Sequence, residues 1–67
     1  MNSTEVGKKL IELRGDKTQV QVAKDLGISD SALSAYEQGV RIPRDEVKIR
    51  IAAYYGVTVG SIFFNAE

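Results

Sequence analysis

Residues 19–39 read QVQVAKDLGISDSALSAYEQG, and this stretch determines the fold. Apolar residues recur here every three or four positions, as they do along the buried faces of two short helices. The residues with this spacing are Val22, Ala23, Leu26, Ile28, Leu33 and Tyr36. Gly27 can adopt the left-handed conformation that ends a helix, and Gly39 ends the second helix. The spacing therefore predicts two helices that share a core, with the outer face of the second helix exposed.

Helix-start signals extend this interpretation to the whole chain. The expected helices span about residues 4–14, 19–26, 30–38, 44–55 and 59–64. Ser3 or Thr4 can cap the first helix. Thr18 and Gln21 have the spacing of a capping box, in which the hydroxyl accepts from one backbone N–H and the glutamine side chain reaches back to another. The other expected N-caps are Ser29 for the third helix and Thr58 for the fifth.

Apolar stripes on the other three helices complete the expected core. They consist of Val6, Leu10 and Leu13, then Val47, Ile51 and Tyr54 or Tyr55, then Ile62 and Phe63. Gly7 is expected to weaken the first helix by roughly 1 kcal/mol relative to alanine. No segment shows the alternation of a strand. The chain is therefore expected to form one all-α domain over residues 1–67, a compact bundle of five short helices.

The composition limits the chemistry of the chain, because its 67 residues include neither histidine nor cysteine. Asp45 and Glu46 are adjacent acids, and neighbours on a helix do not face each other. The glycines are dispersed and form no phosphate-binding loop. No catalysis, metal, cofactor or small-molecule substrate is therefore expected. The apolar runs are too short to span a membrane and no secretory signal is evident, so a cytoplasmic protein is expected.

A linked set of residues extends from the 19–39 motif towards the C-terminus. It comprises Thr18-Gln19, Ala23 and Gly27, then Tyr36-Glu37-Gln38-Gly39, Arg41 and Pro43, then Ala52-Ala53-Tyr54-Tyr55-Gly56-Val57-Thr58 and Ile62-Phe63-Phe64. This set resembles the Cro and lambda-repressor (XRE) type of helix-turn-helix DNA-binding proteins. The resemblance implies a lambda repressor-like fold. It also implies a small stand-alone transcriptional regulator, a bacterial or phage repressor, that binds double-stranded DNA as a homodimer with helix 30–38 in the major groove.

The resemblance also implies roles for individual residues. The DNA phosphates would be contacted by Thr18, Gln19, Gln38, Arg41 and Arg44. The bases would be read by Ser29, Asp30, Ser31, Ser34 and Ala35. The serine hydroxyls bond to several base edges and discriminate little, whereas Ala35 can contact only a thymine methyl group. Asp30 either accepts from a cytosine amino group or simply favours the positive end of the helix dipole.

Nine basic and nine acidic residues cancel, and zero net charge counts against DNA binding. Segment 40–50 is locally basic, however, and predicts a basic rim. Arg41 and Arg44 follow the third helix directly, which favours phosphate contact over simple solvation. Lys48 and Arg50 are expected to be solvated charges.

Two further expectations concern contacts between side chains. The resemblance also implies that Arg14 and Glu37 form a structural ion pair, although the segment between Arg14 and Gln19 is about two residues shorter than is usual in the family. Phe64, with Ile62 or Tyr55, forms either an ordinary, partly buried edge or a C-terminal patch for a dimer partner.

A rival interpretation keeps the scaffold and changes the partner. The chain would then be a protein-interaction module, such as an antirepressor or modulator that binds a repressor. The zero net charge, Asp30 and the lack of long basic side chains on the third helix favour it. A third interpretation is an inactive remnant of a larger protein, and the complete five-helix pattern counts against it.

Overall fold

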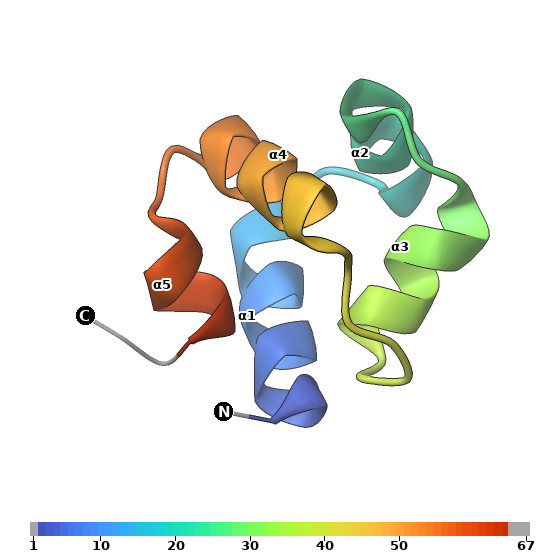
Figure 1. Ribbon diagram of the computed structural model, residues 1–67. Helices are drawn as coiled ribbons and strands as arrows, with labels where there is room; N and C mark the ends of the chain where they lie inside the picture. Colours follow the sequence, from blue (N-terminus) through green and yellow to red (C-terminus); the bar gives the residue numbers. More distant parts are fainter. Residues whose placement is uncertain (1, 65–67) are drawn as a thin grey trace.

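The computed structural model describes residues 2–64, which form five helices (Figure 1). These are α1 (Ser3–Arg14), α2 (Gln19–Leu26), α3 (Asp30–Glu37), α4 (Asp45–Tyr55) and α5 (Val59–Phe63). The predicted all-α bundle is confirmed, and every helix begins and ends within one residue of its predicted position. None of the helices described is long and apolar enough to cross a membrane.

One apolar cluster in the described residues holds the helices together, and every helix contributes to it. Its members are Val6, Leu10, Val22, Ala23, Leu26, Leu33, Tyr36, Ile51, Ala52, Ile62 and Phe63. α1 packs against both α3 and α5, while α4 packs against α2 and α5 (Figure 1). α3 packs mainly against α1 and α2. The side of α3 that faces away from these two helices is therefore left uncovered.

Side-chain caps fix the helix starts, and three of them are as predicted. The hydroxyls of Thr18, Ser29 and Thr58 each accept from the backbone N–H three residues later, at 3.0–3.1 Å. The expected cap of α1 was wrong: Asn2 caps it, with Oδ1 accepting from the Glu5 N–H at 2.8 Å, because the helix begins one residue earlier.

The capping box of α2 is only half formed. Gln21 was expected to reach back to the start of the helix. Its Nε2 donates instead to Asp25 Oδ1 at 2.9 Å, one turn further along α2. A helical neighbour at i+4 thus replaces the backbone N–H as the partner of the glutamine side chain.

α1 and α3 meet at Gly7 with their backbones in close contact. A Cβ at position 7 would overlap the carbonyl oxygen of Glu37 and lie 2.8 Å from its carbonyl carbon. The sequence interpretation considered only the helix-weakening effect of this glycine. The structure shows that the missing side chain is what lets α3 lie this near to α1.

The two tyrosines at the end of α4 have different surroundings. The Tyr54 hydroxyl donates to Asp25 Oδ2 at 2.7 Å and accepts from Lys17 Nζ at 3.1 Å, which links α4 to α2. This hydrogen bond lowers the pKa of the Asp25 carboxyl below its ordinary value. The Tyr55 hydroxyl is buried without a hydrogen-bond partner among the described residues. Burial raises the pKa of Tyr55 to about 12.

Replacing Tyr55 by phenylalanine is expected to raise the free energy of unfolding by about 1 kcal/mol, because the change removes a buried hydroxyl that has no partner. The advantage should grow at alkaline pH. The folded protein keeps the phenolic proton up to about pH 12, whereas the unfolded chain loses it near pH 10.0. The free energy of unfolding of the wild type therefore falls as the pH rises through this window. Tyr55→Phe has no phenol at position 55 and escapes this part of the loss.

Urea unfolding of both proteins at neutral pH and at alkaline pH measures this difference. Tyr54→Phe is the matched control, and it should lose stability at neutral pH because the Tyr54 hydroxyl is hydrogen-bonded. A Tyr55→Phe protein that is less stable than the wild type at both pH values would contradict the assignment.

Candidate nucleic-acid interface

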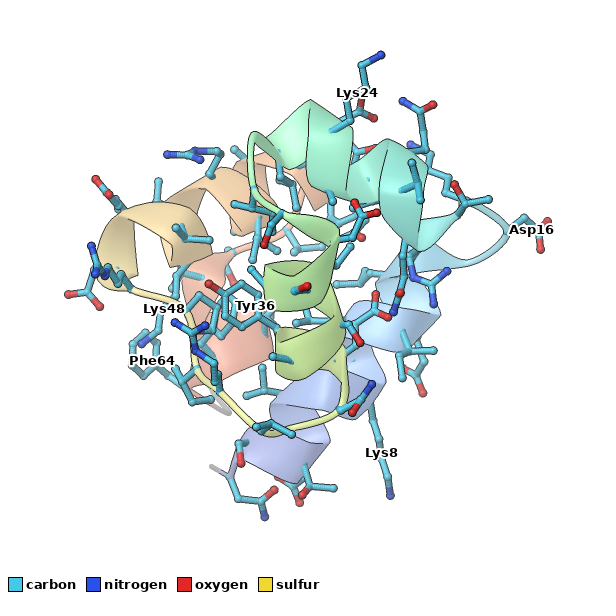
Figure 2. All side chains as sticks on the ribbon, turned by 90° about the vertical axis from the view of Figure 1, so that its right-hand side faces the viewer. Lys8, Asp16, Lys24, Tyr36, Lys48 and Phe64 are labelled. Atoms are coloured by element: carbon cyan, nitrogen blue, oxygen red, sulfur yellow. The ribbon has the colours of Figure 1, made fainter. Side chains whose placement is uncertain are left out.

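The outward face of α3 borders a shallow, open hollow of about 450 Å³. Figure 2 looks at α3 from outside, with α2 above it. The hollow is lined by Gln19, Asp30, Ser31, Ser34, Ala35, Gln38 and Val40. The structure thus brings four of the five expected base-reading residues together with two of the expected phosphate contacts. Ser29 does not line the hollow.

The turn between α2 and α3 sets the direction of this face. Gly27 has φ 74° and ψ 30°, in the left-handed region, and the Ile28 N–H donates to the carbonyl oxygen of Ala23 at 3.0 Å. The chain then starts α3 at once. This connection turns Leu33 and Tyr36 into the core, where they are 1% and 6% exposed. The opposite side of α3 consequently faces solvent.

The expected base-reading side chains differ in their exposure and in the hydrogen-bonding groups that remain free. Asp30 and Ser31 are exposed, and Ala35 presents a half-buried methyl group. The Ser29 hydroxyl is engaged as the N-cap of α3. Ser34 Oγ accepts from Gln38 Nε2 at 2.8 Å and keeps its own hydrogen for donation. The face that a ligand would contact therefore consists of short side chains, and Asp30 is the charged residue among them.

A buried carboxylate joins three helices behind this face. Glu37 Oε2 lies 2.7 Å from Arg14 Nε, and Glu37 Oε1 lies 3.1 Å from Arg14 Nη2. The side chain of Glu37 is only 2% exposed, and the hydrogen bond to it raises the pKa of Arg14. Arg14 Nη1 also donates to the carbonyl oxygen of Lys17 at 2.8 Å. The short connection between α1 and α2 therefore allows the ion pair between Arg14 and Glu37 to form. The hydrogen bond from Arg14 to Lys17 also fixes the conformation of this connection.

Gln19 belongs to the same network. Its Nε2 donates to Glu37 Oε1 at 2.8 Å, so one of its two amide hydrogens is engaged inside the protein. The second hydrogen and the amide oxygen are not used in that bond. Gln19 is half-buried and also lines the hollow, so its amide lies at the boundary between α2 and the outer face of α3.

The other expected phosphate contacts lie at α2, at the end of α3 and in the segment that leads to α4. Thr18 Oγ1 accepts from the Gln21 N–H, which leaves the hydroxyl hydrogen available to a phosphate. Arg41 and Arg44 are exposed in the segment between α3 and α4. Arg44 is the N-cap residue of α4 but makes no side-chain cap, so the first backbone N–H groups of α4 are open to an acceptor. The Gln38 side chain lies back over α3.

Val40 lines the hollow, although the sequence interpretation did not single it out. Its side chain is 70% exposed, and its backbone N–H donates to the carbonyl oxygen of Ala35 at 2.9 Å. The signal that could have found it is an apolar residue outside every expected stripe, placed directly between Gly39 and Arg41. Val40 adds a second apolar group to the face that Ala35 belongs to.

Lys48 and Arg50 were expected to be solvated charges; this was wrong for Lys48, whereas Arg50 is exposed and in addition holds one backbone partner. Arg50 Nη1 donates to the carbonyl oxygen of Leu26 at 2.8 Å, which satisfies the C-terminal end of α2. Lys48 Nζ lies 4.8 Å from the ring centroid of Phe64 and 3.6 Å from Asp45 Oδ1, and its side chain is 12% exposed. Asp45 is a neighbour of Lys48 on α4 itself. Helical periodicity does not reveal the contacts with Leu26 and Phe64, because these residues come from another helix and from the C-terminal end. The basic rim beside α3 therefore rests on Arg41 and Arg44.

Of the residues considered for a dimer patch, Tyr55, Ile62 and Phe64, the structure places Ile62 in the core. Ile62 is 2% exposed because α5 turns it and Phe63 into the core. Tyr55 is half-buried with its hydroxyl inside the protein, which agrees with the alternative of ordinary partial burial. Phe64 remains 54% exposed.

The fold and the exposed face of α3 define a helix-turn-helix protein of the Cro and lambda-repressor (XRE) type. The family model described as Helix-turn-helix matches residues 8–62, and the chain belongs to this family. The chain is also 28% identical over 57 residues to the "Cryptic phage CTXphi transcriptional repressor RstR" of Vibrio cholerae, an alignment that covers 85% of this chain and 51% of that protein. It thus spans about half the length of that relative. No solved structure shows a significant match.

Proposed function

We propose that this protein is a transcriptional regulator that binds double-stranded DNA through the outer face of α3. The observation that carries the proposal is the position of this uncovered face between the N-terminus of α2 and the exposed Arg41 and Arg44. Membership of the helix-turn-helix family and the similarity to a phage transcriptional repressor support it.

In the proposed complex, α3 enters the major groove and the flanking groups bind the phosphates. The N-terminus of α2, with Thr18 and Gln19, supplies N–H and O–H donors and the positive end of a helix dipole. Arg41 and Arg44 supply the charge on the other side. Because Glu37 binds both Arg14 and Gln19, α2 and α3 meet the DNA as one preformed unit. Less conformational freedom is then lost on binding.

The side chains around the hollow are expected to discriminate only weakly between DNA bases. Ala35 and Val40 present apolar groups that match a thymine methyl, and Asp30 can accept from a cytosine amino group. Ser31 and Ser34 can bond to several base edges and add little discrimination. We therefore attribute most of the affinity to the phosphate contacts and a smaller part to the bases.

We further propose that the protein acts as a homodimer in the cytoplasm and that residues 1–67 form one domain. A symmetric dimer places two α3 helices in successive major grooves, about 34 Å apart. Such a complex covers a promoter site, so the simplest regulatory outcome is repression.

Binding to duplex DNA is expected to weaken as salt rises, and Arg41→Ala or Arg44→Ala should each reduce the slope of log affinity against log salt by about one. The reason is that each arginine releases counterions from one phosphate. Fluorescence anisotropy with a random-sequence duplex over a range of salt concentrations gives the slopes.

Lys8→Ala is the matched control, because Lys8 is an exposed cation on α1 that does not line the hollow. Its slope should equal that of the wild type. A wild type that binds no duplex at low salt, or arginine variants with an unchanged slope, would refute the proposed DNA contact.

A further inference from the structure

The glutamine that follows α3 folds back over the outward face of this helix. Gln38 is exposed, and its Nε2 donates to Ser34 Oγ, one turn earlier, at 2.8 Å. Gln38 consequently lines the same hollow as Ser34 and Ala35. The family resemblance implied a phosphate contact for Gln38, but a side chain that reached beyond the end of α3 would suit that role better than one tied to Ser34.

We propose that Gln38 reads an adenine in the major groove. The inference rests on the proposed DNA-binding function, because it requires the outer face of α3 to lie against base edges. A glutamine amide pairs with adenine through two hydrogen bonds, in which its N–H donates to N7 and its oxygen accepts from the N6 amino group. Gln38 has both groups free within the described residues, since its bond to Ser34 uses one amide hydrogen and leaves the other hydrogen and Oε1.

The bond to Ser34 also selects among the bases. Guanine presents two acceptors in the major groove, N7 and O6, and only two donors satisfy both. Gln38 keeps one amide hydrogen, so its own oxygen would lie against the guanine O6. Cytosine offers only an amino donor, and thymine offers only the O4 acceptor beside its methyl group. Adenine is therefore the base that satisfies both free groups of Gln38.

Gln38 differs in this respect from the other polar residues described in the hollow. Gln19 is half-buried, and its Nε2 donates to the buried carboxylate of Glu37 at 2.8 Å. The remaining polar residues of the hollow are an aspartate and two serines, which are shorter. Gln38 thus combines the longest exposed polar side chain of the hollow with a free donor and a free acceptor.

Replacement of single atoms in a bound duplex tests this role. The wild type first selects duplexes from a random pool, and each adenine of a selected duplex is then replaced in turn by 7-deazaadenine, which lacks the N7 acceptor. At one adenine of each half-site, this replacement should weaken binding about fivefold or more, because it leaves the amide hydrogen of Gln38 without a partner. Fluorescence anisotropy measures the affinities.

The variant Gln38→Ala should bind the selected duplex about tenfold more weakly than the wild type. It should also bind the duplexes with adenine and with 7-deazaadenine at that position equally well. The variant should fold, because the Gln38 side chain is exposed and its backbone N–H bond to Ser34 is kept. Ser34→Ala should narrow the preference for adenine over guanine, because both amide hydrogens of Gln38 are then free.

Gln21→Ala is the matched control. Gln21 is also an exposed glutamine whose Nε2 donates to a side chain four residues away, that of Asp25, but it does not line the hollow. Its replacement should leave the affinity within about twofold of the wild type and keep the response to 7-deazaadenine.

A phosphate contact by Gln38 gives a different result. Gln38→Ala would then weaken every duplex by the same factor and would keep the wild-type response to 7-deazaadenine. That result, or selected duplexes in which no adenine responds to the replacement, would overturn the assignment and leave DNA binding in place. A wild type that binds no duplex at low salt would remove the proposed function and this role together.

Discussion

Gly7→Ala is expected to destabilise the protein by about 3 kcal/mol, although alanine is the better helix former. Helix propensity alone predicts a gain of roughly 1 kcal/mol. The added Cβ would overlap the carbonyl oxygen of Glu37, which belongs to the backbone and cannot rotate away. α1 and α3 must then separate, and the core between them opens. A domain of this length has a total stability of roughly 3–10 kcal/mol, so the loss is about a third of it or more.

Urea unfolding of Gly7→Ala, followed by circular dichroism, measures this loss. Lys8→Ala, at the neighbouring exposed position of the same helix, is the control and should change stability by less than about 0.5 kcal/mol. If Gly7→Ala were as stable as the wild type, the close crossing of α1 and α3 would be wrong.

Arg14→Ala is expected to cost about 3 kcal/mol, because it leaves the buried carboxylate of Glu37 without its cation. Breaking a buried ion pair from one side typically costs roughly 3–5 kcal/mol. The lower end applies here, since the side chain of Arg14 is 20% exposed and Gln19 still donates to Glu37. Thermal and urea unfolding at low and high salt measure the effect, which should persist at high salt because a buried pair is screened little.

Two variants separate the charge from the packing at this position. Arg14→Lys should lose less than Arg14→Ala, since lysine keeps a cation but cannot hold both carboxylate oxygens and the Lys17 carbonyl at once. The double variant Arg14→Met with Glu37→Met should recover part of the loss, because it removes the unpaired buried charge. A cost below about 1 kcal/mol for Arg14→Ala would show that the pair is not structural.

The sequence predicted the five helices because local signals and packing signals agreed. Thr18, Ser29 and Thr58 mark helix starts by their chemistry, and Leu33 and Tyr36 mark a buried face by their spacing. The cap of α1 was missed because Asn2, Ser3 and Thr4 are all good caps, and only the packing of α1 decides among them. The role of Gly7 was missed because propensity describes one helix, whereas the contact with Glu37 joins residues far apart in the sequence.

The sequence predicted which residues lie at the candidate site better than it predicted which groups their side chains contact. Helical spacing placed Asp30, Ser31, Ser34 and Ala35 on the outward face, and the structure brings them into one hollow. The partners of long side chains could not be read from spacing. Arg50 reaches the carbonyl oxygen of Leu26 and Lys48 lies over Phe64, because long flexible side chains find groups on other elements. Ile62 was expected in the core and was also considered for a dimer patch, because a five-residue helix gives too little periodicity to show which side is inside; the structure confirms the core position.

The lack of side-chain hydrogen bonds at Asp30 and Ser31 affects how this protein can evolve. Both side chains are exposed and make no side-chain hydrogen bond within the described residues, while Glu37, Gly7 and the core hold α3 in place from behind. Substitutions at these two positions therefore leave folding nearly unchanged and alter only what the helix presents outward. Under the proposed DNA-reading role of α3, descendants of such a gene can acquire a new binding preference in single steps, without passing through an unstable intermediate.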